Sequence, residues 1–276
     1  MFADLHLHSA FSDGTDTPLE LCNLAINNDV KVIAITDHDS AAGRKALLNE
    51  KIPQNLRIID GVEISIIENK KMIHILGYYI DIYDKRLDDF IETMSVDTTE
   101  NTRINFEKAR NENIFLYDWE RVLELNPGMP RIGGTAVVTA MGIDGYEVPG
   151  MDLWDMFHKY FWPENDNYIS HLTFTKYDAI DLIKTIGGIP VIAHPKSIKN
   201  DDIVFDLIKY GLQGIEIYHP IHGEDDIQKY LQVAEDKKLY ITGGSDWHGE
   251  NTGEGRAFAS TGLAHGDYDI LKFEKS

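Results

Sequence analysis

The residues best suited to chemistry lie near the amino end of the chain, where two histidines and two aspartates fall within ten positions. Asp4, His6 and His8 alternate with apolar residues, and Asp13 follows in a polar stretch. Successive side chains of a β-strand point to opposite faces, so a strand here would place Asp4, His6 and His8 on one face. Two imidazoles at this spacing can converge on one cation, and a carboxylate from the following loop can join them. The stretch therefore predicts a metal site.

Other side chains that could bind metal follow later apolar runs of the sequence. The β-branched run 30–35 leads to Asp37 and His38, and the run 189–193 leads to His194. Gly244-Ser245-Asp246-Trp247-His248 follows the run 239–242 in the same way. Parallel strands of a barrel end at one mouth, so these side chains are expected to gather there. Four more residues belong to this set: Glu63, His74, Glu216 and His219.

This set is too large for a single ion. One zinc site needs three or four protein ligands, whereas the mixture of imidazole and carboxylate here suits two or three cations, with Glu63 able to bridge two of them. Such a cluster activates water and neutralises phosphate oxygens, which is the chemistry of phosphate-ester hydrolysis. The alternative, a polar barrel mouth without metal, would bury like-charged carboxylates without compensation.

Alternating apolar strands and helices position these residues. Beyond the opening strand, we expect strands at 30–35, 56–65, 72–79, 189–193, 214–219 and 239–242, separated by helical patterns, which is typical of a parallel α/β barrel. Residues 81–167 differ, because they contain long polar helical patterns and no buried-strand run. The sequence thus predicts a discontinuous barrel domain, residues 1–80 and 168–276, and an inserted helical subdomain, residues 81–167.

Composition limits the possible partners. The chain has 276 residues and a formal net charge of −20, from 46 acidic and 26 basic residues. This charge disfavours long nucleic acid, although a metal site could still capture a small anion or a strand end. The single cysteine, Cys22, cannot form an internal disulfide, and no apolar run reaches the ~18 residues of a membrane span. We expect a cytoplasmic protein with no membrane association, and the sequence indicates no obligate protein partner.

Five ordered motifs resemble those of the polymerase and histidinol phosphatase (PHP) family of metal-dependent phosphoesterases. They are Asp4-Leu5-His6-Leu7-His8, Thr36-Asp37-His38-Asp39, Gly61-Val62-Glu63, Ala193-His194-Pro195 and Gly244-Ser245-Asp246-Trp247-His248. The resemblance implies a distorted (β/α)7 TIM-like barrel and two or three divalent metal ions, Mn, Fe or Zn. It assigns His6, His8, Glu63 and Asp246 to a first metal, Glu63, His74 and His194 to a second, and Asp13, His38 and His248 to a third. Asp4, Asp37 and Glu216 are expected to support these ligands without binding metal.

The resemblance also implies hydrolysis of a small phosphate ester, a nucleotide or sugar phosphate monoester, by a metal-bridging hydroxide. We expect Arg131 to clamp the phosphate, because a guanidinium fork fits phosphate oxygens, although a solvated surface charge is the simpler interpretation. His171 and Lys196 are further predicted substrate contacts, and His219 is the predicted general acid. The aromatic residues of 154–162 are expected to pack the insertion rather than to cover a nucleobase.

Two other functions stay open at this point. The same centre could serve an exonuclease that acts on a short oligonucleotide end, or a cyclic phosphodiesterase. A non-catalytic module that binds metal or phosphate is disfavoured by the complete ligand set. Asp13 is the one ligand position that departs from the type common in the family, which is His, and an aspartate remains a competent ligand.

Overall fold

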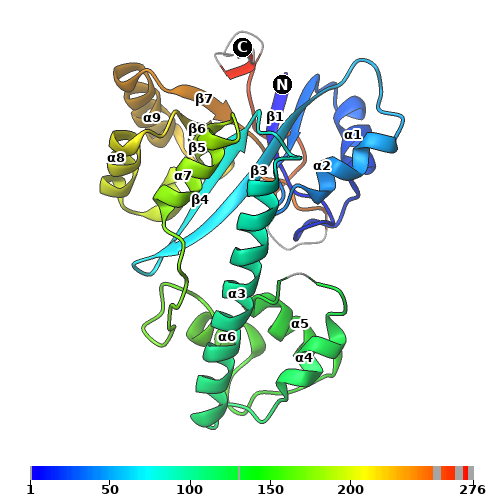
Figure 1. The fold of residues 1–276 in the computed structure, drawn as a ribbon, viewed down its shortest axis with the longest axis vertical. Helices are drawn as coiled ribbons and strands as arrows, with labels where there is room; N and C mark the ends of the chain where they lie inside the picture. Colours follow the sequence, from blue (N-terminus) through cyan, green and yellow to red (C-terminus); the bar gives the residue numbers. More distant parts are fainter. Residues whose placement is uncertain (1, 130, 251–255, 265–269, 273–276) are drawn as a thin grey trace. The chain divides into compact units, whose positions relative to one another are not determined.

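The structure is a computed structural model that describes residues 2–129, 131–250, 256–264 and 270–272. The chain divides into two compact units (Figure 1). The barrel unit comprises Met1–Ile66, Ile73–Leu87 and Lys176–Ser276, and the helical unit comprises Ile67–Met72 and Asp88–Thr175.

Seven strands form one sheet in sequence order, and the sheet is nearly closed into a barrel. The His8 N–H donates to the carbonyl of Trp247 over 2.9 Å, which joins the end of the first strand to the segment after the last. The predicted distorted barrel with a mainly helical insertion is confirmed. The strands are β1 (Ala3–Leu7), β2 (Val32–Ile35), β3 (Arg57–Glu68), β4 (Lys71–Tyr78), β5 (Ile189–Ile192), β6 (Gly214–Tyr218) and β7 (Tyr240–Gly243).

The sheet is mixed, and here the expectation of parallel strands throughout is wrong. Strands β1 to β3 are parallel, and so are β5 to β7, but β4 runs antiparallel to β5. Only Asn69 and Lys70 separate β3 from β4, and both have left-handed φ values, 51° and 62°. Two residues can make a hairpin but cannot make the crossover that a parallel neighbour requires. His74 therefore lies inside β4 rather than at the C-terminal end of a parallel strand.

Helices of the barrel unit flank the two halves of the sheet. Figure 1 shows α1 (Pro18–Asn27) and α2 (Ala42–Ala46) beside β1 to β3, and α7 (Lys176–Thr185), α8 (Asp201–Tyr210) and α9 (Glu224–Lys237) beside β5 to β7. Thr17 and Glu20 form a capping box at the start of α1, and Pro18 occupies its first position. Short 3-10 helices lie at Leu47–Asn49, Pro195–Ile198 and Ile270–Lys272.

Apolar packing fixes the strands that position the site. Leu21, Cys22 and Ala25 of α1 pack in one buried cluster with Ile33 and Ile35 of β2. Full burial of each Leu or Ile side chain stabilises the fold by about 1.5–3 kcal/mol. Cys22 is a buried free thiol, and so acts as a small apolar residue of this core.

The helical unit has a core of its own. Its helices are α3 (Lys85–Asn111, assigned to this unit from Asp88), α4 (Trp119–Leu125), α5 (Gly134–Ile143) and α6 (Leu153–Tyr160). Phe157, Tyr160 and Phe161 are buried there with Phe106, whereas Trp154 is 59% exposed. Within the described part of the chain, no helix combines the length and the apolar character that a membrane crossing needs.

Candidate metal centre

Glu63 is the central side chain of the candidate site. It lies within β3 and is fully buried. Its Oε2 is 3.1 Å from His6 Nε2 and 3.2 Å from His8 Nε2, whereas its Oε1 is 3.0 Å from His74 Nδ1 and 3.3 Å from His194 Nε2. The two carboxylate oxygens thus face two different pairs of imidazoles, which is the arrangement of a bridging ligand.

One candidate group brings together His6, His8, Glu63 and Asp246, the residues that the resemblance assigns to a first metal. Their role as ligands stays a prediction. Asp246 Oδ1 lies 3.4 Å from His6 Nε2 and 3.1 Å from His8 Nε2. Ligands held about 2.0–2.2 Å from one metal stand roughly 3.0–3.5 Å apart, so these separations suit a common ion.

Several buried atoms of this centre lack a hydrogen-bond partner. They are His6 Nε2, both ring nitrogens of His8, both carboxylate oxygens of Glu63 and His74 Nδ1. A buried polar atom without a hydrogen bond costs about 1–3 kcal/mol, and such atoms are rare in native proteins. Here these unpartnered atoms lie close to one another, at separations that suit ligands of a common metal ion. The residues present therefore fit divalent metal ions.

A second group surrounds Oε1 of Glu63. His74 and His194 approach this oxygen, as the predicted assignment requires. The structure also places His38 close by, with Nδ1 3.1 Å from Glu63 Oε2, and one possible ligand group combines His38, Glu63 and His74. His38 therefore lies between the second and third predicted sites.

The third group consists of His8, Asp13, His38 and His248. Asp13 Oδ1 is 3.5 Å from His8 Nδ1 and 3.4 Å from His248 Nε2, and Asp13 Oδ2 is 3.7 Å from His38 Nε2. The Asp13 side chain is 55% exposed, whereas that of Glu63 is fully buried. This is the most open of the three predicted positions, and its ligand set stays a prediction.

Opposite charges offset the burial of these ionisable groups. Burial alone would raise the pKa of Glu63, but the imidazoles around it, including those of His6 and His74, hold it well below its usual value. Burial alone would lower the pKa of His8, but its contacts with Asp246 and Glu63 raise it to about 10. The cluster thus keeps its carboxylates ionised, and metal binding to His8 must displace a proton.

Glu216 contacts the ring of one candidate ligand, His6, and the main chain of another, His194. Its Oε1 lies 3.0 Å from His6 Nδ1, and its Oε2 accepts the main-chain N–H of His194 over 2.8 Å. A carboxylate at Nδ1 fixes the tautomer that leaves the Nε2 lone pair of His6 facing Glu63 and Asp246. Asp4 accepts the N–H and the hydroxyl of Ser245, at 2.9 and 2.7 Å, and no candidate ligand group of the described residues includes it.

Asp37 shapes the turn that carries Asp13. Its Oδ1 accepts the N–H of Ser9 at 2.7 Å and the hydroxyl of Ser12 at 2.8 Å, and its Oδ2 accepts the Ser9 hydroxyl at 2.8 Å. A side chain at Gly43 would collide with this carboxylate, since an added Cβ would lie 2.1 Å from Oδ2. Asp37 therefore contacts the turn rather than the cluster of imidazoles.

The remaining predicted residues lie in different surroundings. His219 is 2% exposed, with Nε2 3.0 Å from Asp246 Oδ2. Lys196 pairs with Asp226 at 2.6 Å. Arg131 and His171 belong to the helical unit. The general-acid role of His219 and the substrate contacts of Lys196, Arg131 and His171 stay predictions.

Sequence reasoning missed Arg256. Its Nη1 donates to the main-chain oxygen of Asp246 over 2.9 Å and also contacts Asp246 Oδ2. No motif marks this arginine, which follows Asp246 by ten positions in a glycine-containing segment. Proximity in sequence to a predicted ligand was the one signal that could have drawn attention to it.

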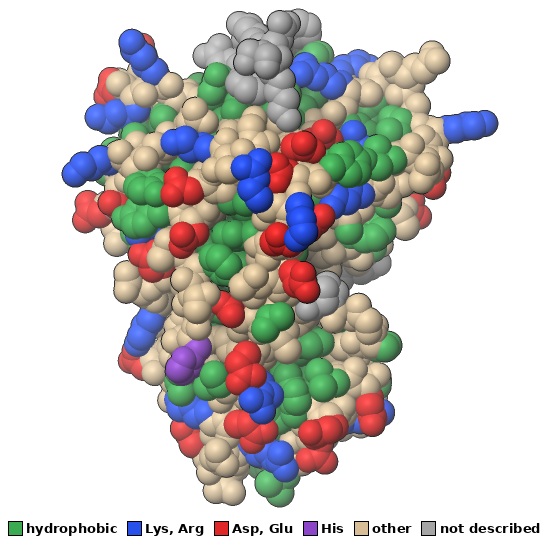
Figure 2. Space-filling view, viewed as in Figure 1, with side chains coloured by type: hydrophobic (Ala, Val, Ile, Leu, Met, Phe, Trp, Pro, Cys, Tyr) green, Lys and Arg blue, Asp and Glu red, His purple; other side chains and the backbone are tan. Residues whose placement is uncertain are grey.

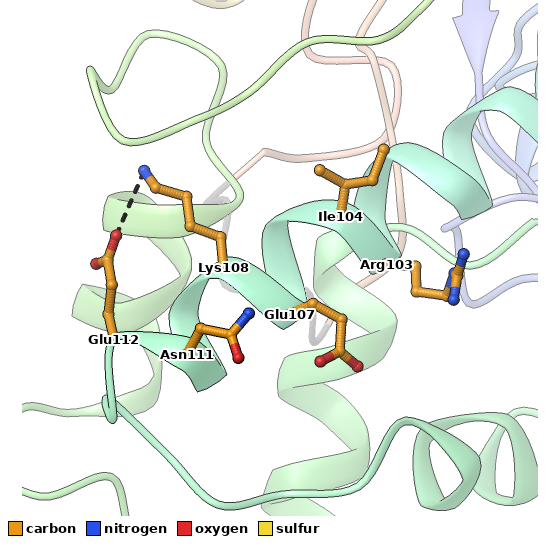
Figure 3. Close-up of a pocket in the computed structure, with 6 residues that line it drawn as sticks. All are labelled: Arg103, Ile104, Glu107, Lys108, Asn111 and Glu112. Atoms are coloured by element: carbon orange, nitrogen blue, oxygen red, sulfur yellow. Dashed lines mark ion pairs between the residues drawn. The ribbon is translucent and has the colours of Figure 1, made fainter.

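A hollow of about 500 Å³ lies elsewhere, along α3 of the helical unit (Figure 3). Lys108 and Glu112, two of its charged residues, form an ion pair at 3.9 Å. The candidate ligand groups of the described residues include none of its lining side chains, so the hollow does not compete with the cluster as a metal site. The lining comprises Arg103, Ile104, Glu107, Lys108, Asn111 and Glu112.

Known proteins resemble this chain over most of its length. It is 30% identical over 258 residues to the 3',5'-nucleoside bisphosphate phosphatase of Chromobacterium violaceum, covering 91% of this chain and 88% of the relative. It is 28% identical over 257 residues to the phosphoribosyl 1,2-cyclic phosphate 1,2-diphosphodiesterase of Eggerthella lenta, covering 91% and 95%. The 5'-3' exoribonuclease Rnm of Escherichia coli is 28% identical over 258 residues, covering 89% and 84%.

Solved structures agree with these relatives. A structure described as a candidate metal-dependent phosphoesterase of Bifidobacterium adolescentis matches 97% of this chain and 94% of its own, with a TM-score of 0.78 and 25% identity. The family model of the PHP domain matches residues 4–165, more than half of the chain. The chain therefore belongs to the PHP domain family.

Proposed function

We propose that this chain is a metal-dependent phosphoesterase that hydrolyses a small phosphate ester, a nucleotide or a sugar phosphate. The observation that carries the proposal is the buried Glu63 carboxylate, whose two oxygens lack hydrogen bonds and face separate pairs of imidazoles. The names of the relatives support it, because each describes an enzyme that cleaves a phosphate ester bond.

The proposal gives the centre two or three ions of Mn, Fe or Zn. His6, His8, Glu63 and Asp246 would hold one, Glu63, His74 and His194 a second, and Asp13, His38 and His248 a third. Metal ions bound there would lower the pKa of water and neutralise the charge on phosphate oxygens. The mixture of imidazole and carboxylate suits all three metals.

The residues around the centre hold these ligands in place. Glu216 fixes the tautomer of His6, and Asp37 fixes the turn before Asp13. His219 contacts Asp246 through Nε2, and its Nδ1 accepts the N–H of Ile221 over 3.3 Å. This geometry supports orientation of Asp246 by His219, since both ring nitrogens already have partners.

The test is metal analysis combined with a substrate panel. Purified full-length protein should contain two or three equivalents of Mn, Fe or Zn. It should also release phosphate from a nucleoside bisphosphate faster than it cleaves a sugar cyclic phosphate or a short RNA. Protein that holds no metal and shows no turnover with added Mn²⁺ would refute the proposal.

The variants Asp246→Asn and Asp202→Asn form a matched pair within the barrel unit. Asp246 belongs to a candidate ligand group, whereas Asp202 is exposed on α8. The first variant should lose hydrolysis while it stays folded, and the second should retain it. Faster cleavage of the cyclic phosphate would favour the phosphodiesterase alternative, and faster cleavage of RNA ends would favour the exonuclease.

A further inference from the structure

The carboxylate of Asp246 presents its two oxygens to different partners. Oδ1 lies 3.1 Å from His8 Nε2 and 3.4 Å from His6 Nε2, within the first ligand group. Oδ2 lies 3.0 Å from His219 Nε2 and contacts Arg256 Nη1. One oxygen is thus available to a metal ion, and the other is held on the opposite side of the carboxylate.

The main chain at Asp246 also needs support. Its φ of 51° lies in the left-handed region, which non-glycine residues adopt at an energetic cost. Arg256 Nη1 donates to the main-chain oxygen of this same residue over 2.9 Å. One guanidinium nitrogen therefore contacts both the backbone and the side chain of Asp246.

The position of Arg256 suits a supporting role. Its side chain is 21% exposed, whereas that of Asp246 is 6% exposed. The part-buried positive charge of Arg256 contacts Asp246 in a cluster that also buries the carboxylates Glu63 and Glu216. Charge-assisted hydrogen bonds of this kind are stronger than neutral ones and fix the direction of the carboxylate.

We propose that Arg256 is a positioning residue of the metal centre, which acts through Asp246 and directs Oδ1 towards His6 and His8. The inference rests on the proposed metal centre and goes beyond it, because it assigns a role to a residue outside every candidate ligand group. Residues that orient metal ligands typically change metal affinity or activity 10–100-fold when they are removed.

The experiment measures Mn²⁺ affinity of the chelator-stripped full-length protein by calorimetry. Arg256→Gln should bind Mn²⁺ about 10–100-fold more weakly than wild type. Arg256→Lys, which retains the charge, should lose less affinity than Arg256→Gln. The matched control is Arg44→Gln, because Arg44 is also a part-buried arginine of the barrel unit and pairs with Asp60, outside the ligand groups. This control should bind Mn²⁺ like wild type.

A kinetic measurement separates positioning from substrate contact. At saturating Mn²⁺, Arg256→Gln should retain the KM of wild type for a nucleoside bisphosphate. Unchanged Mn²⁺ affinity would overturn the inference, and unchanged affinity with a KM raised more than tenfold would assign Arg256 to the substrate instead. If Arg256→Gln does not fold, the Mn²⁺ affinity and the KM of Arg256→Lys are measured instead. An Mn²⁺ affinity of Arg256→Lys equal to that of wild type would then overturn the inference. Wild-type protein that binds no Mn²⁺ would refute the proposed function itself, whereas equal binding by wild type and variant would refute this inference alone.

Discussion

At the scale of single residues, Glu63 links the parts of the candidate centre. Its oxygens approach imidazoles that come from β1, from the residue directly after β1, from β4 and from the segments after β2 and β5. Five histidines have a ring nitrogen within 3.3 Å of one of these oxygens. Loss of its charge should therefore affect more than one metal position.

The first prediction concerns a substitution that removes the charge of Glu63 and keeps the size of the side chain. Glu63→Gln should lower kcat/KM at least about 100-fold, since substitutions behind the ligands already cost 10–100-fold. It should also reduce the metal content by more than one equivalent, because both oxygens face ligand groups. Phosphate release and elemental analysis test this, with Glu50→Gln, an exposed residue, as the control. A variant that retains its full metal content would contradict the bridging role.

The second prediction concerns the proton on His8. With a pKa of about 10, His8 is protonated in the metal-free protein at neutral pH. Metal uptake should therefore release protons, and Mn²⁺ affinity should rise with pH up to about 10. The raised pKa of His8 also stabilises the metal-free fold. This contribution to the free energy of unfolding is complete below pH about 6.5, the pKa of His8 in the unfolded chain, and is lost as pH rises through about 10, its pKa in the folded protein. Binding heats that do not vary with the ionisation enthalpy of the buffer would contradict proton release.

At the scale of elements, the junction of β1 with the segment after β7 determines whether the first ligand group forms. Gly244 follows β7, and an added Cβ would lie 2.3 Å from His6 Cβ and 2.4 Å from His6 N. The backbones can approach this closely because residue 244 has no side chain. His6 and Asp246 lie on the two sides of this contact.

The third prediction follows from that approach. Gly244→Ala should destabilise the metal-free protein by about 1–3 kcal/mol, because β1 and the segment after β7 must move apart. It should also weaken Mn²⁺ binding. Gly223→Ala is the control in the same unit, since its added Cβ would meet no atom closer than 3.8 Å. Urea unfolding measures both variants, and equal stabilities would show that the junction tolerates the added methyl group.

The fourth prediction concerns the turn before Asp13. Asp37→Asn replaces one accepting oxygen with a donor, although Ser9 and Ser12 offer only donors to it. The turn should loosen, and the protein should lose about one metal equivalent while the first group stays filled. Ser12→Ala, which removes a single donor, should have a smaller effect. Loss of all bound metal would indicate that Asp37 supports the whole centre rather than this turn.

Local patterns in the sequence were sufficient to predict most elements, whereas the assignment of ligands to metals came from the family resemblance and stays a prediction. Buried strands such as β2 and β5 appear as short apolar runs, and candidate ligands such as His38 and His194 lie shortly after them. The direction of β4 could not be predicted, because Asn69 and Lys70 form a left-handed turn without a glycine. Arg256 was missed because no motif marks it, and its position ten residues after Asp246 was the only signal in the sequence.

At the scale of the whole molecule, the net charge of −20 governs the approach of an anionic substrate. Figure 2 shows acidic and basic side chains interspersed on the face drawn, without a continuous basic area among the coloured atoms. A long polyanion therefore meets net repulsion before it reaches any metal site. A small phosphate ester carries less charge and meets less of this repulsion.

The fifth prediction is that this repulsion makes kcat/KM depend on the salt concentration. For a long RNA, kcat/KM should rise between 20 and 200 mM salt, because the Debye length falls from about 20 Å to about 7 Å over this range. For a nucleoside bisphosphate the change should be smaller. Parallel assays at constant Mn²⁺ measure both substrates. A kcat/KM for RNA that falls with salt would indicate a basic binding surface and favour the exonuclease alternative.

The near closure of the barrel also bears on how the protein is made. Ser245 binds Asp4 across 241 positions of the sequence, and the first ligand group joins β1 to the segment after β7. Contacts between such distant segments give a high contact order, and folding slows as contact order rises. A chain emerging from the ribosome holds His6 and His8 long before Asp246 is synthesised. The first metal group can therefore form only once translation has passed Asp246, so a shorter nascent chain lacks the complete centre.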